Sequence, residues 1–249
     1  MVGDQPGRTV EAADGSRNEV TASVLYLFDI DGTLLHAHGS GRTAFDAAFT
    51  KHHGLVDASE GIRYGGKTDP GILAEIFRAR LGREPTAAEI AALLDDYVPR
   101  LRALLAEHGA QIIDGVIEAL EHLATRDGVV MGVATGNIRA GAEAKLAAAR
   151  RDQIASPLNA RFVLGGYGCD SHVRAQLVAR AIERGRARGA NGEVVVVGDT
   201  IHDIAAARAC NATVCAVATG ADPADELGGA DVVFASLAEL PAWHAERFG

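Results

Sequence analysis

Short apolar segments alternate along this chain with longer segments that carry helical patterns. Six apolar segments are rich in β-branched residues and are non-polar at nearly every position; they lie at 24–30, 128–135, 161–166, 193–199, 213–220 and 230–236. Strands of this kind are covered on both faces, and strand–helix alternation is typical of a parallel sheet wrapped by helices. The pattern therefore predicts an open α/β core.

The stretch between the first two predicted strands has no comparable strand. It carries helical patterns at 41–53, 69–82 and 86–109, and the last of these opens with Thr86 and Glu89 in capping-box spacing. A further helix at 116–125 rejoins the core. We predict a polar N-terminal tail at 1–22, a core formed by 23–36 and 113–249, and an inserted helical cap domain at 37–112.

Composition and charge narrow the class of protein. The chain has 249 residues, of which 48% are hydrophobic and 23% are charged, as in ordinary globular proteins. The net charge of -9, with no Lys/Arg-rich block, argues against a nucleic-acid or anionic-lipid partner. No apolar segment approaches the ~20 residues needed to cross a bilayer. We expect no nucleic-acid or membrane partner, and a monomer or a homodimer.

The N-terminal residues and the cysteines predict the cellular location of the protein. Residues 1–20 are polar and lack the basic start and apolar run of a signal peptide or anchor. The three cysteines, Cys169, Cys210 and Cys215, are odd in number and show no CxxC spacing, which argues against a disulfide framework or a zinc site. These features predict a cytoplasmic protein.

Acidic residues follow two of the predicted strands. Asp29 and Asp31 end the first strand, and Asp199 and Asp203 follow the strand at 193–199. The carboxyl ends of parallel strands meet at one edge of the sheet, where open α/β proteins assemble their sites. Crowded carboxylates repel unless a cation neutralises them, and oxygen ligands of this kind suit Mg²⁺. The sequence therefore predicts that the four carboxylates converge on Mg²⁺.

A third strand ends in a weaker signal. Thr135 and Gly136 follow the strand at 128–135, where a hydroxyl and the exposed amides before a helix are suited to bind a phosphate oxygen. The tripeptide Thr135–Asn137 is common by itself. Its place on the strand after the insertion puts it at the same sheet edge as Asp29.

Taken together, these motifs resemble the haloacid dehalogenase superfamily, in the phosphoglycolate phosphatase-like subfamily whose helical cap follows the first core strand. The resemblance spans roughly residues 24–240. It implies a three-layer, Rossmann-like parallel-sheet core with an inserted helical cap. It also implies that Asp29 attacks phosphorus and that Asp31 protonates the leaving oxygen and then activates water. Thr135 would bind the phosphoryl group.

The same resemblance assigns the metal ligands and a cation. Asp199 would bind Mg²⁺ together with the Asp29 carboxylate and the Asp31 carbonyl, and Asp203 would hold a metal-bound water. The family's Lys-Pro element is missing from this sequence. We take Arg174, at the start of a helix, as the phosphate-binding cation, with Lys145 as the alternative.

Three other features of the sequence lie outside the acidic motifs. Gly39–Ala44 fits a relaxed GxGxxA, but it lies past the strand in the linker to the cap, so a dinucleotide site is not expected. The four histidines of the linker and first cap helix lack metal-ligand spacing and are expected to be solvated: His36, His38, His52 and His53. Lys67, in a Gly-rich cap turn, either connects two helices or reads the substrate.

The sequence thus predicts a Mg²⁺-dependent phosphatase that acts on a small phosphorylated metabolite through an aspartyl-phosphate intermediate. A phosphomutase on the same scaffold, a dehalogenase and a non-catalytic phosphate-binding protein are the alternatives. Asp31 argues against the dehalogenase, which does not need the second carboxylate, and against the non-catalytic binder. The mutase stays open because shielding of the phosphoenzyme depends on the cap.

Overall fold

The computed structural model describes residues 23–249. Its centre is a six-stranded, fully parallel sheet in the order β10-β9-β8-β1-β4-β7. The strands are β1 (Val24–Phe28), β4 (Val129–Ala134), β7 (Leu164–Gly166), β8 (Val194–Gly198), β9 (Thr213–Val217) and β10 (Val232–Phe234). Each of the six predicted strand segments contains one of these strands, and the predicted α/β parallel-sheet fold is confirmed.

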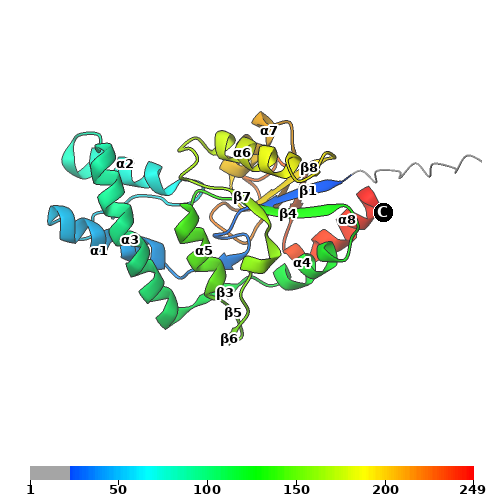
Figure 1. Cartoon of the computed structure of the whole chain (residues 1–249), viewed down its shortest axis with the longest axis horizontal. Helices are drawn as coiled ribbons and strands as arrows, with labels where there is room; N and C mark the ends of the chain where they lie inside the picture. Colours follow the sequence, from blue (N-terminus) through cyan, green and yellow to red (C-terminus); the bar gives the residue numbers. More distant parts are fainter. Residues whose placement is uncertain (1–22) are drawn as a thin grey trace, which may run out of the picture.

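Helices cover both faces of this sheet. Helices α6 (Arg174–Arg186) and α7 (Ile201–Ala209) lie on one face, and α4 (Val116–Ala124) and α8 (Leu240–Phe248) lie on the other (Figure 1). Along β1, Leu25 and Leu27 pack into the apolar cluster under α6 and α7, whereas Tyr26 and Phe28 pack into the cluster on the opposite face. Burial on both sides explains why the strand is apolar at every position.

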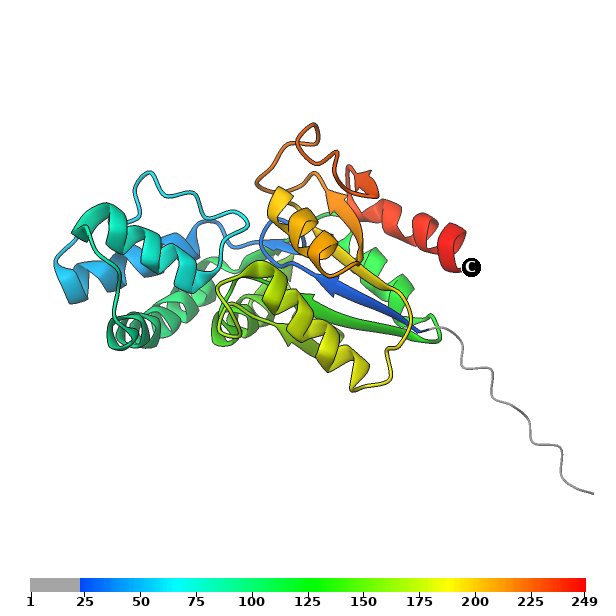
Figure 2. The ribbon, with the colours of Figure 1, turned by 90° about the horizontal axis from the view of Figure 1, so that it is seen from above.

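The segment between β1 and β4 contains the predicted helices. These are α1 (Ser40–His53), α2 (Asp69–Leu81) and α3 (Ala87–His108), and Thr86 and Glu89 form the predicted capping box of α3. The three helices lie together beyond the carboxyl ends of the sheet strands, at the end of the molecule opposite α8 (Figures 1 and 2). Helix α3 packs against α1 and against α5 (Arg139–Ala147) of the core.

A second, small sheet was not predicted. It has the order β2-β3-β5-β6 and consists of β2 (Leu35–His36), β3 (Ala110–Ile112), β5 (Ala149–Arg151) and β6 (Ile154–Ala155). Strands β2 and β3 are the two chain crossings between the core and the three helices, and they pair antiparallel. The two crossings are therefore hydrogen-bonded to each other. The predicted domain boundaries, at 36 and 113, remain a prediction.

Two short 3₁₀ turns, Asn159–Arg161 and Leu237–Glu239, complete the secondary structure of the described part. Within residues 23–249, no helix combines the length and the apolar character that crossing a bilayer requires. The predicted tail at 1–22 lies outside the described residues.

Candidate functional site

The site lies where β1 ends at the centre of the sheet. Asp29 follows β1 directly, and its amide donates to the carbonyl of Val197 on the neighbouring β8 at 2.8 Å. The Asp29 residue is only 6% exposed. Both neighbours of β1 are main-sheet strands, so the position of Asp29 is fixed from two sides.

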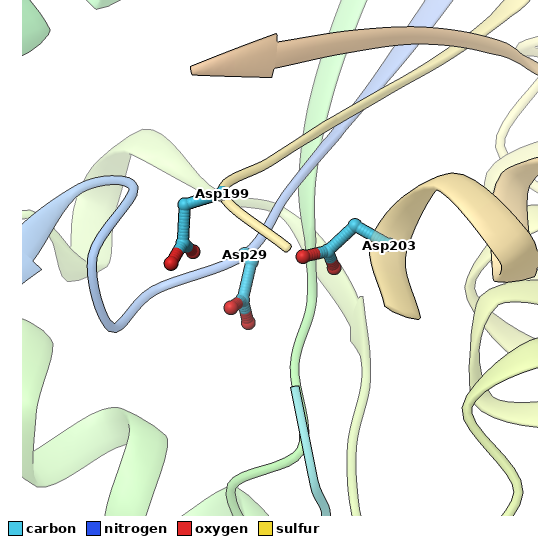
Figure 3. Close-up of side chains that lie close together, drawn as sticks. All are labelled: Asp29, Asp199 and Asp203. Carbon is cyan, nitrogen blue, oxygen red and sulfur yellow. The ribbon is translucent and has the colours of Figure 1, made fainter. Parts of the chain in front are cut away.

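Three buried carboxylates gather at this point. Asp199 follows β8, Asp203 lies in the first turn of α7, and each offers a carboxylate oxygen within 4.8 Å of one on Asp29 and on each other. Figure 3 shows the three side chains, from three separate segments of the core, with their carboxylates turned toward a common space. The predicted convergence is therefore present for these three residues.

Asp199 is held in place by the loops beside it. Its Oδ1 accepts a hydrogen bond from the Thr33 hydroxyl at 2.9 Å, and its Oδ2 accepts one from the Ala221 amide at 2.8 Å. Gly32 has a φ of +83°, and a Cβ there would lie 2.5 Å from Asp199 Oδ2. The Gly in the DxDGT motif is thus required by both its backbone conformation and the space that Asp199 occupies.

The two carboxylate oxygens of Asp203 have different partners. Its Oδ2 accepts hydrogen bonds from the amide and hydroxyl of Thr200, at 3.1 and 2.6 Å, and so completes a capping box of α7. Its Oδ1 faces Arg174 instead. The helix cap therefore fixes one carboxylate oxygen and leaves the other directed to the site.

Arg174 begins α6 and reaches into the acidic trio. Its Nε and Nη2 donate to Asp203 Oδ1 at 2.9 and 2.6 Å, and Nη2 lies 3.0 Å from Asp29 Oδ1. Its Nη1 donates to the carbonyl of Gly66 in the cap at 3.3 Å. The guanidinium is 9% exposed. One arginine thus contacts the predicted nucleophile, a predicted metal-site carboxylate and the cap backbone.

Lys145, the alternative cation, is also at the site but serves a different carboxylate. Its Nζ lies 2.7 and 2.6 Å from the two oxygens of Asp31, and it donates to Asn137 Oδ1 at 2.7 Å. Asn137 in turn donates to Asp31 Oδ2 at 2.7 Å. The structure therefore places both candidate cations, one on Asp29 and one on Asp31.

Thr135 is fully buried at the end of β4. Its Oγ1 accepts a hydrogen bond from the Asn137 side chain at 2.8 Å and a longer one from the Asn137 amide at 3.3 Å. Because both contacts use the oxygen as acceptor, the hydroxyl proton is available to a phosphate oxygen.

Gly136 marks the contact between core and cap. A Cβ at this position would lie 2.0 Å from the carbonyl oxygen of Lys67, so only glycine fits against the cap backbone. The Gly136 carbonyl accepts a hydrogen bond from the Asp69 amide at 2.8 Å. In this structure Gly136 has a close-approach role in addition to its predicted place at the phosphate.

The cap is seated on the core at a second point. Asp222, in the loop after β9, accepts a hydrogen bond from the Ile201 amide at 2.8 Å and also contacts the guanidinium of Arg63 from the cap. The cap segment 63–69 therefore contacts two core loops, which contain Gly136 and Asp222, and the Asp222 loop is in turn bonded to the start of α7 at Ile201.

A cavity of about 500 Å³ lies between cap and core. The predicted residues that line it are Asp29, Asp31, Lys67, Thr135, Gly136, Lys145, Arg174 and Asp199. Its volume is in the ~300–1,000 Å³ range of small-molecule sites. Asp203 does not itself line the cavity. Lys67 lines it from the cap side and forms an ion pair with Glu75.

Asp69, which also lines the cavity, was not predicted from the sequence. It is 6% exposed, and its Oδ2 accepts a hydrogen bond from the Ile138 amide at 2.8 Å. In the sequence, Thr68-Asp69-Pro70 reads only as a helix start, and Thr68 is indeed the N-cap of α2. The functional position follows from the docking of α2 on the core, which no local pattern records.

The electrostatics of the acidic trio favour a bound cation. Burial raises the pKa values of Asp29 and Asp199, and the neighbouring carboxylates raise them further. Arg174 and, more weakly, a hydrogen bond from the Ile30 backbone oppose this rise in the pKa of Asp29. A hard divalent ion at the three oxygens would restore the ionised forms, so the donor set fits Mg²⁺.

Asp31 is in a different electrostatic state. Burial alone would raise its pKa, but Lys145 and the Asn137 amide outweigh burial and hold the pKa below its ordinary value. Asp31 is therefore ionised here and placed to accept a proton.

The Gly39–Ala44 segment and the linker histidines contribute nothing to the acidic trio, although His36, His38 and Gly39 line the cavity. Gly39 is the left-handed N-cap of α1 and does not follow a main-sheet strand. Among residues 23–249, Asp29, Asp199 and Asp203 form the one group of His, Cys, Asp or Glu with metal-ligand spacing, and it contains no histidine. All three cysteines are free.

Comparisons with known proteins agree with this architecture. A sequence model of the haloacid dehalogenase-like hydrolases matches residues 25–211. No curated protein gave a significant match.

Among solved structures, CbbY from Rhodobacter sphaeroides in complex with phosphate is 22% identical, with a TM-score of 0.67 over 87% of this chain and 95% of its own. A predicted phosphatase from Clostridium acetobutylicum is 19% identical, with a TM-score of 0.66 over 90% and 99%. A predicted phosphoglycolate phosphatase from Haemophilus somnus is 18% identical, with a TM-score of 0.63 over 90% and 99%. At these identities the likeness establishes the fold.

Proposed function

Because the chain belongs to the haloacid dehalogenase-like hydrolases, we propose that it is a Mg²⁺-dependent phosphomonoesterase acting through an aspartyl-phosphate on Asp29. The family confirms the predicted enzyme class, a hydrolase. The observation that carries the finer proposal is the position of Asp29 beside Asp199, Asp203 and the Arg174 guanidinium, facing the cavity between cap and core. The phosphate complex of the CbbY neighbour supports a phosphorylated substrate.

In the first step, an oxygen of the Asp29 carboxylate attacks phosphorus and the bond from phosphorus to the leaving oxygen breaks. Arg174 and the Thr135 hydroxyl hold the phosphoryl oxygens, and the leaving oxygen takes a proton from Asp31. Such transfers depend mainly on positioning and charge stabilisation. Mg²⁺, held by Asp29, Asp199 and Asp203, would supply neutralisation of the developing negative charge.

In the second step, water attacks phosphorus and gives its proton to Asp31, and the bond from phosphorus to Asp29 breaks. The ionised Asp31 described above is in the form required here. For the first step Asp31 must carry a proton. We infer that a bound phosphoryl group competes with Asp31 for Lys145, which weakens the interaction that holds the pKa of Asp31 low.

Phosphate release from p-nitrophenyl phosphate tests this function. We expect release with Mg²⁺, loss with EDTA and recovery with added Mg²⁺. Asp29→Asn should remove turnover and keep the native circular dichroism spectrum, and Asp31→Asn should lower kcat by about 10²–10⁴-fold, the usual contribution of an acid–base group. Normal turnover by Asp29→Asn would refute the aspartyl-phosphate mechanism.

The phosphomutase remains the alternative that this assay must separate. A mutase returns the phosphoryl group to substrate, so it would release little phosphate and require a bisphosphate activator. Stoichiometric release of phosphate without an activator would support the phosphatase. A cytoplasmic location stays a proposal, supported by the three free cysteines.

A further inference from the structure

The cap side of the cavity contains cations that already have partners. Lys67 forms an ion pair with Glu75, which lies in α2. Arg42 donates through Nη1 to the Ser59 carbonyl and through Nη2 to the Ile62 carbonyl, both at 2.6 Å. The two remaining lysines and arginines of the lining, Lys145 and Arg174, bind the catalytic carboxylates. Within the described chain, every lysine and arginine of the cavity wall is thus engaged.

Arg42 stabilises the cap segment that leads to Tyr64. Its guanidinium lies 4.3 Å from the centroid of the Tyr64 ring, and its two carbonyl contacts hold the segment that leads to Tyr64. Phe45 and Tyr97 stack with ring centroids 4.0 Å apart in the same wall. This part of the cavity is therefore aromatic, and its arginine fixes an aromatic ring.

Asp69 adds a negative charge to the cap wall. Its Oδ2 is used by the Ile138 amide, whereas Oδ1 has no hydrogen-bond donor within residues 23–249. An unsatisfied carboxylate oxygen at a cavity wall accepts hydrogen bonds from hydroxyl groups and repels a second anion. With His36 and His38, which also line the cavity, counted as neutral, the charges of Arg42 and Lys67 are balanced by the carboxylates of Glu75 and Asp69.

Resting on the proposed function, we propose that the substrate is a phosphate monoester whose organic part is uncharged and carries hydroxyl groups. Asp69 accepts a hydrogen bond from one of these hydroxyls. The Lys67–Glu75 ion pair withholds a cation from any second phosphate or carboxylate. Glu75 is therefore a specificity-determining residue that acts through Lys67, although it does not line the cavity itself.

Matched pairs of esters that differ by one anionic group test this substrate class. Glycerol 3-phosphate is compared with 3-phosphoglycerate, and glucose 6-phosphate with 6-phosphogluconate, by phosphate release with saturating Mg²⁺. We expect kcat/KM to be about tenfold or more higher for the uncharged member, which corresponds to ~1.4 kcal/mol for one unpartnered anion. Equal or reversed preference would overturn the substrate class.

The Glu75→Gln variant tests the mechanism of selection. It frees the Lys67 ammonium, so the ratio between uncharged and anionic members should shrink by about tenfold. Glu84→Gln is the matched control, because it removes the partner of Arg78 on the exposed part of the cap and should keep the wild-type ratio. Adding Lys67→Met to Glu75→Gln should restore the preference. An unchanged ratio in Glu75→Gln would refute the role of this pair.

Failure of this proposal is distinguishable from failure of the phosphatase itself. Turnover of p-nitrophenyl phosphate with a preference for anionic esters would overturn the substrate class alone. No phosphate release from any ester would overturn the proposed function, and the substrate class with it.

Discussion

The substitution Asp69→Asn tests the energetic effect of the buried charge at the contact between cap and core. The carboxyl is buried, and burial raises its pKa from the ordinary 3.8 to about 6 in spite of the nearby Lys145. The asparagine side chain has nearly the same shape, and its carbonyl oxygen can still accept the hydrogen bond from the Ile138 amide. The substitution therefore removes a buried charge and keeps the contact.

The magnitude follows from the difference in proton affinity between the folded and unfolded chain. The folded protein binds the Asp69 proton more tightly, so the wild type loses stability as pH rises from about 3.8 through about 6. A difference of about two pH units corresponds to ~3 kcal/mol. Asp69→Asn should thus exceed the wild type in free energy of unfolding by ~3 kcal/mol at pH 8 and by about half of that at pH 5.

Urea unfolding at several pH values measures this difference. Asp170→Asn is a control of opposite sign, since its bidentate ion pair with Arg184 lowers the pKa of Asp170. That variant should be less stable than the wild type at pH 8 and approach it as pH falls. A loss of stability in Asp69→Asn at pH 8, or a gain that does not depend on pH, would refute the reasoning.

Three further substitutions probe the site. Arg174→Lys should lower kcat by about tenfold or more, because one ammonium cannot bind Asp203, Asp29 and the Gly66 carbonyl together. Arg174→Met should lower the free energy of unfolding in urea by ~3–5 kcal/mol, because it leaves buried carboxylates unpaired. Wild-type kinetics in both variants would contradict this role of Arg174. Lys145→Met should lower kcat about a hundredfold in steady-state phosphate release, because Asp31 loses the partner that sets its position. An unchanged kcat would argue against this positioning role of Lys145. Gly136→Ala should displace the Lys67 backbone, raise KM and lower the free energy of unfolding by ~1–3 kcal/mol, as measured by thermal unfolding. A crystal structure of this variant with the cap in its wild-type position would contradict the prediction.

The clustering of Asp29, Asp199 and Asp203 was predictable from the sequence because parallel strands end at the same edge of a sheet. Asp29 and Asp199 each follow a buried apolar strand, and strands of a parallel sheet end at one edge whatever the intervening chain does. The positions of the two aspartates depend on strand order, which periodic patterns record. The role of Arg174 was implied by the resemblance to the family, and its place at a helix start singled it out as the candidate.

The contacts that were missed depend on the docking of the cap. Asp69 reaches Ile138 across the contact between cap and core, and Lys67 reaches Glu75 within the cap, eight residues along the chain. Neither pair has the i,i+4 spacing of neighbours on a helix. The joint use of Lys145 and Arg174 was also missed, because the sequence posed them as alternatives for one position. Strands β2 and β6 contain two residues each and are too short for any alternating pattern.

The central place of β1 in the sheet has a consequence for the synthesis of the protein. Val24 pairs with Val129 and Leu25 with Val194, so the strand that bears Asp29 is translated first and receives its second neighbour only when β8 has left the ribosome. At the usual elongation rates this interval is roughly 10–30 s. During that time a fully apolar strand has an open edge, which invites chaperone binding or association with other nascent chains. Catalytic competence is thus among the last properties that the growing chain acquires.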